Sequence, residues 1–368
     1  LHPHMANAED KQKAEAALLD WLAGGEYTVR DQIGKVRLNQ IAELLGPKAA
    51  DALLKHMEDP KNSQTALSKL LFKMNDPAVA KALLEAGSAW LRGEGMTKVR
   101  GPFNLSPNHE FGLLVDGFDT DPCVANPHNS AYYPGIYESI GLVSVKDWYA
   151  YWMDNGEVPP TIERIAKRFM KRNPELRIRE VDLSRWDEEI ELVYDIYMDA
   201  WEHNWGHVGL TREEFLFSAA GMKQIIDPKL CYFAYMGDEL AGMSVTLPDY
   251  NQVAKKMNGS IFPFGWWHFL TQRRKIDTLR IFILGIKKEY QRLPLGAPLY
   301  LKTWEAGLAR NVRGAEASLI LDDNHRMRGA LEKLGATVYK TYRSYELALV
   351  EGELIGEERE KAEKEAAE

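Results

Sequence analysis

Residues 281–300 read Ile281-Phe-Ile-Leu-Gly-Ile-Lys-Lys-Glu-Tyr-Gln-Arg-Leu-Pro-Leu-Gly-Ala-Pro-Leu-Tyr300 and contain three successive structural signals. The first six residues form an uninterrupted apolar run bounded by polar residues, which is typical of a buried strand. The polar segment that follows holds Pro294 and Gly296, which interrupt regular structure. A helical pattern then continues to Arg310. The stretch therefore predicts a strand, a loop and a helix in direct succession, a unit of an α/β protein.

Strands and helices also alternate on both sides of this stretch. The expected strands are Met96–Gly101, Val143–Met153, Arg177–Asp182, Cys231–Met236, Glu239–Pro248, Thr278–Ile286, Ala315–Leu321 and Thr337–Leu347. The expected helices are Tyr133–Ile140, Thr161–Asn173, Arg185–His203, Thr211–Gln224 and Arg326–Leu334, and Gly101–Pro134 is expected to be a loop. Residues 6–92 show helical spacing alone, in Ala14–Ala23, Leu38–Leu45, Lys48–Met57, Ser63–Met74 and Pro77–Leu91. The pattern predicts an α/β (α+β) fold preceded by a helical segment.

The composition excludes several classes of protein. The chain has 368 residues, of which 45% are hydrophobic and 27% charged, so it is too apolar for disorder and long enough for two or three domains. No apolar run approaches about 18 residues and no signal-peptide core follows the start, so a cytoplasmic location is expected. Cys123 and Cys231 are the only cysteines, too few for a disulfide scaffold or a thiolate zinc cluster, and no metal site is expected. The net charge of −8 argues against a general nucleic-acid binder.

The chain also contains an internal repeat at an offset of 194 residues. The matched pairs are Glu138 with Glu332, Ile140 with Leu334, Gly141 with Gly335, Lys146 with Lys340, Trp148 with Tyr342 and Tyr151 with Tyr345. Both copies read as a helix, a glycine turn and a strand. Duplication explains this register better than two unrelated units do.

Three segments carry a resemblance to a known family. Residues 281–300 resemble the acyl-CoA motif of the GNAT superfamily, in which a central strand precedes Arg/Gln-x-x-Gly-x-Gly/Ala and a helix. Two further segments resemble a narrower family, the bacterial ceramide-synthase-like tandem GNAT N-acyltransferases. They are Val99-Arg-Gly-Pro-Phe-Asn-Leu-Ser-Pro-Asn-His-Glu-Phe-Gly-Leu-Leu-Val-Asp-Gly-Phe118 and Trp201-Glu-His-Asn-Trp-Gly206. The resemblance covers roughly residues 70–347.

The resemblance implies a tandem GNAT acyl-CoA N-acyltransferase fold whose first repeat is incomplete or diverged. On this basis residues 1–75 are expected to be an N-terminal helical segment and 76–156 a partial repeat. Residues 157–350 are expected to form a complete acyltransferase domain, followed by an acidic tail at 351–368. The implied activity is direct transfer of an acyl group from acyl-CoA to a primary amine.

In such a fold, acyl-CoA lies along the central strand and over the start of the next helix. The strand backbone pairs with pantetheine, and the free N–H groups and dipole of the helix N-terminus favour the diphosphate. The residues implied in this role are Leu284, Gly285, Ile286, Gln291, Arg292, Leu293, Leu295, Gly296, Ala297 and Asn324. This chain departs from the motif at Pro294, which replaces its first glycine, and at Pro298. Each proline removes one N–H group.

The polar loop Asn104–Glu110 is the most unusual part of the chain, and its amides and carboxylate suit a polar substrate head group. Glu110 is a candidate general base. Glu202 and His203 are others, because a histidine titrates near neutral pH. Tyr137 stands where GNAT enzymes often place a general-acid tyrosine, with packing as the alternative role. The candidate catalytic residues are thus Glu110, Glu202, His203 and Tyr137, and the candidate substrate-binding residues are Asn104, Ser106, Asn108, Asn204, Trp205 and Trp266.

The segment Ile261–Leu270 is packed with aromatic residues and is followed by Arg273, Arg274 and Lys275. Aromatic residues beside a basic cluster suit a membrane interface or an acyl-chain channel. The alternative is a helix that buries its aromatic residues against the sheet. The expected location is therefore cytoplasmic, either free or peripheral at the inner membrane face.

Three functions remain open at this stage. The first is transfer of a long acyl chain to an amine such as a sphingoid base, and the second is acetylation of a small amine. The third is an acyl-CoA-sensing regulator, because Arg37–Gly46 resembles the start of a helix-turn-helix. The mixed charge of Lys48–Asp59 argues against a recognition helix, so no nucleic-acid partner is expected. The expected partners are acyl-CoA and an amine.

Overall fold

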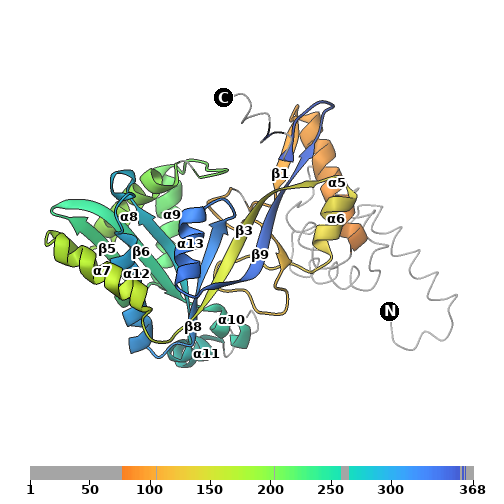
Figure 1. Ribbon diagram of the computed structural model, residues 1–368. Helices are drawn as coiled ribbons and strands as arrows, with labels where there is room; N and C mark the ends of the chain where they lie inside the picture. Colours follow the sequence, from red (N-terminus) through yellow and green to blue (C-terminus); the bar gives the residue numbers. More distant parts are fainter. Residues whose placement is uncertain are drawn as a thin grey trace, which may run out of the picture. The chain divides into compact units, whose positions relative to one another are not determined.

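The computed structural model describes residues 77–104, 106–202, 204–257 and 265–356, together with Arg359 and Lys361 (Figure 1). The helices expected at Ala14–Ala23, Leu38–Leu45, Lys48–Met57 and Ser63–Met74 lie outside the described residues. The remaining expected elements are all present, with ends shifted by a few residues. One expectation is wrong, because the loop predicted at Gly101–Pro134 contains a short strand at Leu113–Asp116.

The chain divides into two compact units, each built from segments that are distant in sequence. The first combines residues 1–99, 132–143 and 345–368, and the second combines residues 100–131 and 144–344. In the first unit, helix α5 (Pro77–Gly93) contacts helix α6 (Tyr133–Ser139). Arg92 Nε donates to the carbonyl of Leu349 at 2.8 Å, and Lys98 pairs with Glu353 at 2.9 Å. These contacts hold the helical pair to the end of the last strand.

The strands form one mixed sheet in the order β1-β9-β3-β8-β7-β6-β5-β4, with β2 also paired to β9. The strands are β1 (Lys98–Gly101), β2 (Leu113–Asp116), β3 (Val143–Asp154), β4 (Leu176–Glu180), β5 (Cys231–Met236), β6 (Glu239–Pro248), β7 (Thr278–Ile286), β8 (Gly314–Leu321) and β9 (Thr337–Ala348). Strands β7 and β8 are parallel, whereas β4 to β7 are successively antiparallel. The α/β fold class predicted from the sequence is confirmed.

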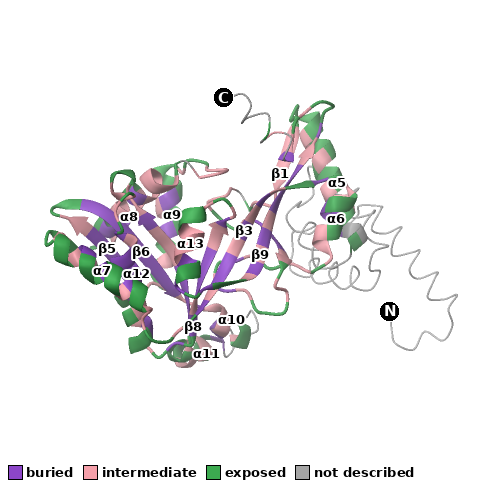
Figure 2. Ribbon diagram, in the orientation of Figure 1, coloured by how far each residue is buried: buried purple, intermediate pink, exposed green. Residues whose placement is uncertain are grey.

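Helices cover both faces of this sheet. They are α7 (Pro160–Arg172), α8 (Trp186–Trp201), α9 (Arg212–Met222), α10 (Asn251–Met257), α11 (Gly265–Gln272), α12 (Gly296–Ala309) and α13 (His325–Lys333), with short 3₁₀ turns at Leu183–Arg185, Pro228–Leu230, Arg273–Lys275 and Lys288–Tyr290. Successive side chains of β5 lie on opposite faces of the sheet. Phe233 packs with Ile196 of α8, whereas Ala234 packs with Leu299 of α12. Burial on both faces explains why β6 is an almost continuous apolar strand (Figure 2).

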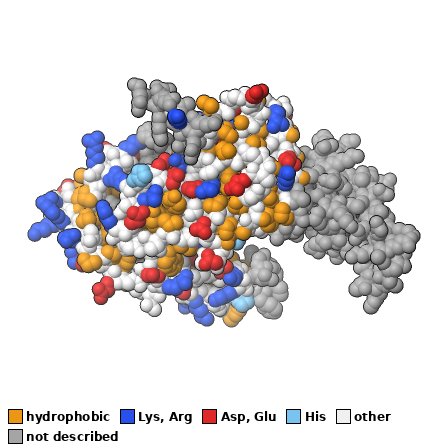
Figure 3. Space-filling view, turned by 45° about the vertical axis from the view of Figure 1, so that its right-hand side comes forward, with side chains coloured by type: hydrophobic (Ala, Val, Ile, Leu, Met, Phe, Trp, Pro, Cys, Tyr) orange, Lys and Arg blue, Asp and Glu red, His pale blue; other side chains and the backbone are white. Residues whose placement is uncertain are grey.

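Charged side chains are unevenly distributed over the surface. On most of the face drawn in Figure 3, acidic and basic side chains alternate with apolar ones. Basic side chains gather at the lower edge of this view, at the level of α10 and α11.

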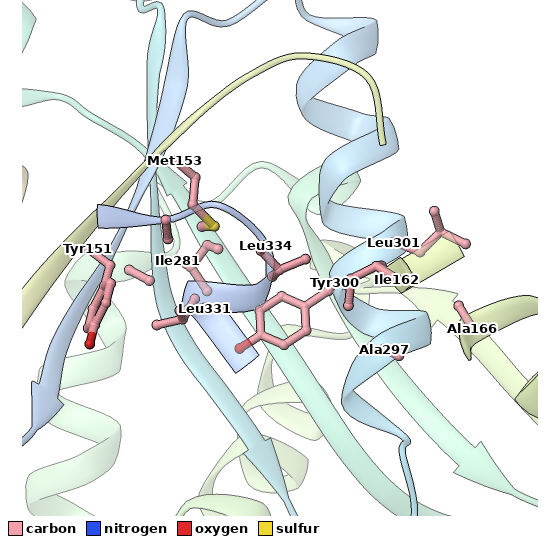
Figure 4. Packing of buried hydrophobic residues seen from close by; sticks show 12 residues of the cluster. Tyr151, Met153, Ile162, Ala166, Ile281, Ala297, Tyr300, Leu301, Leu331 and Leu334 are labelled. Atoms are coloured by element: carbon pink, nitrogen blue, oxygen red, sulfur yellow. The ribbon is translucent and has the colours of Figure 1, made fainter. Parts of the chain in front are cut away.

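The core between the sheet and helices α7, α12 and α13 is built around aromatic and leucine side chains. In Figure 4, Leu331 of α13 and its C-cap residue Leu334 lie between Tyr151 of β3 and Tyr300 of α12. Tyr151 and Leu331 are fully buried. This core fixes α12 and α13 against the edge of the sheet where β7 and β8 separate.

The internal repeat is visible in the structure. Strands β3 and β9 begin and end at residues 194 positions apart, and each follows a glycine with positive φ, Gly141 at 89° and Gly335 at 82°. The first nine residues of the two strands share the same sequence of buried and exposed positions. Lys146 and Lys340, the matched lysines, are both buried. The tandem arrangement is therefore confirmed.

The last strands of the two copies are exchanged. Strand β3, which ends the first copy, pairs with β8 of the second, and β9, which ends the second copy, pairs with β2 of the first. Two short strands of the first copy, β1 and β2, both pair with β9. The corresponding position in the second copy is the single strand β8, which pairs with β3. The loop Asn104–Glu110 lies between β1 and β2. It is thus an insertion within a strand position of the first copy.

The exchange depends on a close backbone contact at Gly117. A Cβ atom there would lie 2.4 Å from the carbonyl oxygen of Tyr339, and φ is +86°. Lys340 Nζ donates to the carbonyls of Gly117 and Thr120 at 2.5 and 2.8 Å. Only glycine permits this approach.

We expect Gly117→Ala to destabilise the protein more than Gly237→Ala does. Both positions have positive φ, but nothing lies within 4 Å of a Cβ at Gly237. Backbone strain costs about 1–3 kcal/mol at either position, and overpacking adds about 1–3 kcal/mol at Gly117 alone. Urea unfolding measures the difference from the shift in midpoint. Equal losses would show that the Gly117 contact is not tight.

Candidate functional site

A cavity of about 1260 Å³ lies in the second unit, where β7 and β8 diverge. The pairing between these parallel strands runs from Thr278–Gly314 to Ile281–Ala317 and then stops. Strand β7 continues to Ile286, still paired to β6 on its other edge. The backbone of Leu284, Gly285 and Ile286 therefore has a strand neighbour on one edge and the cavity on the other. Such an edge offers N–H and C=O groups to an extended ligand.

One side of the cavity is formed by the loop before α12 and by the start of α13. Its lining includes five of the residues that the sequence assigns to acyl-CoA: Gln291, Leu293, Gly296, Ala297 and Asn324. Gln291 Nε2 donates to the carbonyl of Ile286 at 3.1 Å, which fixes the loop to the end of β7. Asn324 is the N-cap of α13 and accepts from the N–H of Met327 at 3.1 Å. The first turn of α12 has no side-chain cap. The N–H of Ala297 bonds the carbonyl of Pro294 at 3.1 Å and Pro298 has no N–H, so Gly296 supplies the amide of this turn that could face an anion.

Two residues predicted for this loop do not line the cavity. Leu295 is fully buried and packs with Phe169 and Tyr232 in the core. Arg292 is exposed and lies outside the lining.

Another part of the cavity lining is aromatic. It includes Phe111, Trp148, Tyr197, Trp201, Trp205 and Phe282. Tyr197 and Trp201 stack with their rings 5.0 Å apart, and Phe111 meets Trp148 edge-on at 4.6 Å. Gly285 makes room for this wall, because a Cβ there would lie 2.7 Å from the Trp201 ring.

The sequence identified only part of this wall. The sequence predicts that Trp205 binds substrate. It marks Trp148 only as a position of the internal repeat and Phe282 only as a residue of a strand. Trp266 was predicted to bind substrate but is not among the lining residues. The signal that was overlooked is the aromatic side chain at position 282 of a strand already predicted to border acyl-CoA.

The polar loop Asn104–Glu110 forms a rim beside the aromatic wall. Asn104, Asn108 and Glu110 line the cavity, whereas Ser106 does not and instead bonds His109 Nδ1 at 3.1 Å. Asn108 Oδ1 accepts from the hydroxyl of Tyr197 at 2.7 Å. Asn104 Nδ2 lies 3.5 Å from Glu110 Oε2. The loop therefore brings two amides and one carboxylate to the same wall of the cavity.

The other base candidates are placed differently. Asn204 lines the cavity, but Glu202 is exposed, pairs with Lys288 and does not belong to the lining. His203 lies outside the described residues. Tyr137 belongs to the first unit, where it packs 5.2 Å from the Tyr345 ring and is not part of the lining. Burial raises the pKa of Tyr137 to about 12.

A buried polar network, which the sequence did not indicate, lies behind the cavity at the last β7–β8 pairs. Arg280 and Ser318 line the cavity, and Arg280 Nε donates to Ser318 Oγ at 3.1 Å. Ser318 Oγ donates to Glu316 Oε1 at 2.5 Å, and Asn126 Nδ2 donates to the same oxygen at 2.6 Å. Tyr339 donates to the second Glu316 oxygen. Burial lowers the pKa of Arg280 because it disfavours the charged guanidinium, and the negative charge of Glu316 partly offsets this effect.

This network places a carboxylate one hydroxyl away from the cavity. Glu316 is fully buried and is connected to the cavity through two lining residues, Ser318 and Arg280, whose Nε lies 3.8 Å from Glu316 Oε1. A buried carboxylate that accepts three hydrogen bonds keeps its position. The site thus has carboxylates in different settings: Glu110 on an exposed rim, Asp323 in the lining and paired with Lys146, and Glu316 behind a serine.

Two searches of the described residues give negative results. No group of three or more His, Cys, Asp or Glu side chains in the described part of the chain is arranged to hold a metal ion. Within that same part, no helix combines the length and apolar character needed to cross a bilayer.

Known proteins are similar to this chain in sequence. No family model matches the chain. It is 37% identical over 282 residues to the bacterial ceramide synthase of Caulobacter vibrioides, covering 75% of this chain and 73% of that protein. It is 34% identical over 281 residues to protein YghO of Escherichia coli, covering 74% and 71%.

Two solved structures are also similar, both with a TM-score of 0.42. One is a GCN5-related N-acetyltransferase from Sphaerobacter thermophilus, at 14% identity over 63% of this chain and 60% of that one. The other is a tandem GNAT protein from the clavulanic acid biosynthesis pathway, at 13% identity over 75% and 71%. Identities of 34% and 37% over 74% and 75% of this chain show that it shares a family with these two proteins. The chain belongs to the bacterial ceramide-synthase-like family of tandem GNAT N-acyltransferases.

Proposed function

We propose that this enzyme transfers a long acyl chain from acyl-CoA to the primary amine of a sphingoid base. The amine nitrogen attacks the thioester carbonyl, the C–S bond breaks, and an amide and CoA are released. The observation that carries the proposal is the shape of the cavity. It has an uncapped helix terminus in one part of its lining and a polar rim with an aromatic wall in another. Both reactants would meet at the diverging strands, where proximity lowers the barrier.

The donor would occupy the side of the cavity formed by β7 and α12. The edge of Leu284–Ile286 that β8 does not cover would pair with the pantetheine arm, and one of its N–H groups would face the thioester oxygen. The diphosphate would lie over the first turn of α12. Because Pro294 and Pro298 have no N–H, fewer backbone donors are available, and Gly296 permits close approach.

The acceptor would occupy the aromatic side. A sphingoid base carries an amine, an adjacent oxygen and a long alkyl chain. Asn104 and Asn108 offer hydrogen-bonding groups for the oxygen, and Glu110 offers a negative charge for the amine. The aromatic wall offers apolar surface for the chain. The cavity of about 1260 Å³ exceeds the roughly 300–1,000 Å³ typical of small-molecule pockets, which suits a site that must hold acyl-CoA and an acceptor together.

The amine must lose a proton before or during attack. Glu110 is our candidate base, because it lies on the cavity wall within the polar rim. The alternative path runs from the amine through Ser318 to Glu316. A positioned base typically contributes about 10²–10⁴ to the rate.

We expect Gly296→Trp to prevent CoA binding and Gly296→Ala to preserve it. A Cβ at Gly296 lies 3.6 Å from Ile286, an ordinary contact, so alanine fits, whereas an indole would fill the space over the helix start. A ligand present at 100 times its Kd stabilises the native state by about 2.7 kcal/mol. Thermal unfolding with and without CoA measures this. An equal upward shift of Tm in wild type and Gly296→Trp would show that the CoA loop is misassigned.

We expect Glu110→Gln to lower turnover by about 10²–10⁴ while leaving the thermal shift with CoA unchanged. The assay is mass-spectrometric detection of amide product from long-chain acyl-CoA and a sphingoid base. Ser318→Ala is the matched variant for the second proton path. Full activity of Glu110→Gln together with loss in Ser318→Ala would transfer the base to Glu316.

The same assay tests the acceptor class. Amide product from the wild-type enzyme with a sphingoid base, and little with short polar amines, is the expected result. If acetyl-CoA and a small amine give product while every long-chain amine fails, the enzyme is a small-amine acetyltransferase and the sphingoid assignment is wrong.

A further inference from the structure

The insertion between β6 and β7 carries an exposed aromatic and basic surface that the proposed reaction does not use. Its aliphatic and aromatic members are Trp266, Trp267 and Leu270 of α11, and its basic members are Lys255, Lys256, Arg273, Arg274 and Lys275. We call these eight residues the insertion surface. None of them lines the cavity.

Helix α11 divides into an inward and an outward side. Gly265 is buried, and Phe269 stacks on Tyr250 with the rings 5.9 Å apart and nearly parallel. In contrast, Trp266 is 46% exposed, Trp267 56% and Leu270 49%. The aromatic residues are therefore not all buried against the sheet. Two neighbouring exposed tryptophans form an apolar patch of the kind that marks a binding surface.

The charge of this segment differs from that of the rest of the chain. Residues 251–276 contain five lysines and arginines and no aspartate or glutamate, in a protein with a net charge of −8. Asp121 from another loop pairs with Lys255, and Lys256 Nζ bonds Gln272. Arg273, Arg274 and Lys275 are exposed in the 3₁₀ turn directly after α11. Figure 3 shows basic side chains gathered in this region.

We propose that the insertion surface binds the surface of an anionic lipid membrane. Tryptophan is favoured at the boundary between head groups and acyl chains, and lysine and arginine are attracted by anionic head groups. The insertion surface carries both features within one short helix and the turn that follows it. A soluble anionic partner would account for the charge but not for two tryptophans and a leucine held outward. The inference does not depend on the identity of the acyl acceptor.

Other exposed groups of the same kinds provide matched controls. Phe217 of α9 is 85% exposed but has no basic cluster beside it in sequence. Helix α7 presents Arg168 and Arg172, both exposed, without an exposed tryptophan. If any exposed aromatic residue or any basic helix were sufficient for binding, substitutions at these control positions would have the same effect as substitutions in the insertion surface.

The test is co-sedimentation of the full chain with vesicles of phosphatidylcholine alone or mixed with phosphatidylglycerol, without any substrate. The wild type should bind the mixed vesicles and bind less at high salt, because screening weakens the attraction. Trp266→Ser with Trp267→Ser, and separately Arg273→Glu with Arg274→Glu, should each lower the affinity about tenfold or more. Phe217→Ser, and Arg168→Glu with Arg172→Glu, should leave it near wild type.

Three results would overturn the proposal. They are failure of the wild type to bind anionic vesicles, equal loss in the α7 control, and unchanged binding in both insertion-surface variants. Binding to DNA or heparin in place of vesicles would identify a soluble polyanion as the partner and also contradict it. Unaltered circular dichroism and CoA-induced thermal shift confirm that each variant is folded. Because the assay needs no turnover, its outcome is independent of the sphingoid assignment.

Discussion

The loss of pairing between two parallel strands beyond Ile281 and Ala317 is the constraint on which the rest of the second unit depends. Backbone N–H and C=O groups in a protein interior need partners, so strands that separate must expose their edges to solvent, to side chains or to a ligand. Here β6 supports one edge of β7 through to Ile286, and α12 and α13 are packed against the widening gap. The gap can therefore stay open without loss of the surrounding core, and it becomes the cavity.

The exchanged final strands determine what borders that gap. Since β3 comes from the first copy and lies beside β8 of the second, Trp148 reaches the cavity of the second copy. The insertion between β1 and β2 brings Asn104, Asn108 and Glu110 to the same cavity. Residues that precede the second copy in sequence therefore form much of the proposed acceptor side. The first copy therefore contributes side chains to the cavity of the second copy.

The buried network around Glu316 carries a cost that the fold must offset. Removing a carboxylate and a guanidinium from water is unfavourable unless both are paired and hydrogen-bonded. Asn126, Ser318 and Tyr339 supply hydrogen bonds to Glu316, and Arg280 bonds Ser318 as well as the carbonyl of Val124. A hydrophobic set of similar volume would pack with less penalty. Placing this network directly beside the cavity, at the point where the strands part, is consistent with a role in holding or deprotonating a substrate.

The sequence alone predicted the order of the described elements except β2, the duplication, and an acyl-CoA role for residues within 284–297, because each prediction rests on local spacing and short motifs. It also selected the polar loop, though not the fact that this loop interrupts a strand position. Only the tertiary structure decided that Trp148, Phe282 and Ser318 share one cavity, that Leu295 is core and that Trp266 lies away from the cavity lining. The physical reason is that strand exchange and strand divergence are long-range pairings, and neither leaves a periodic signal in the chain.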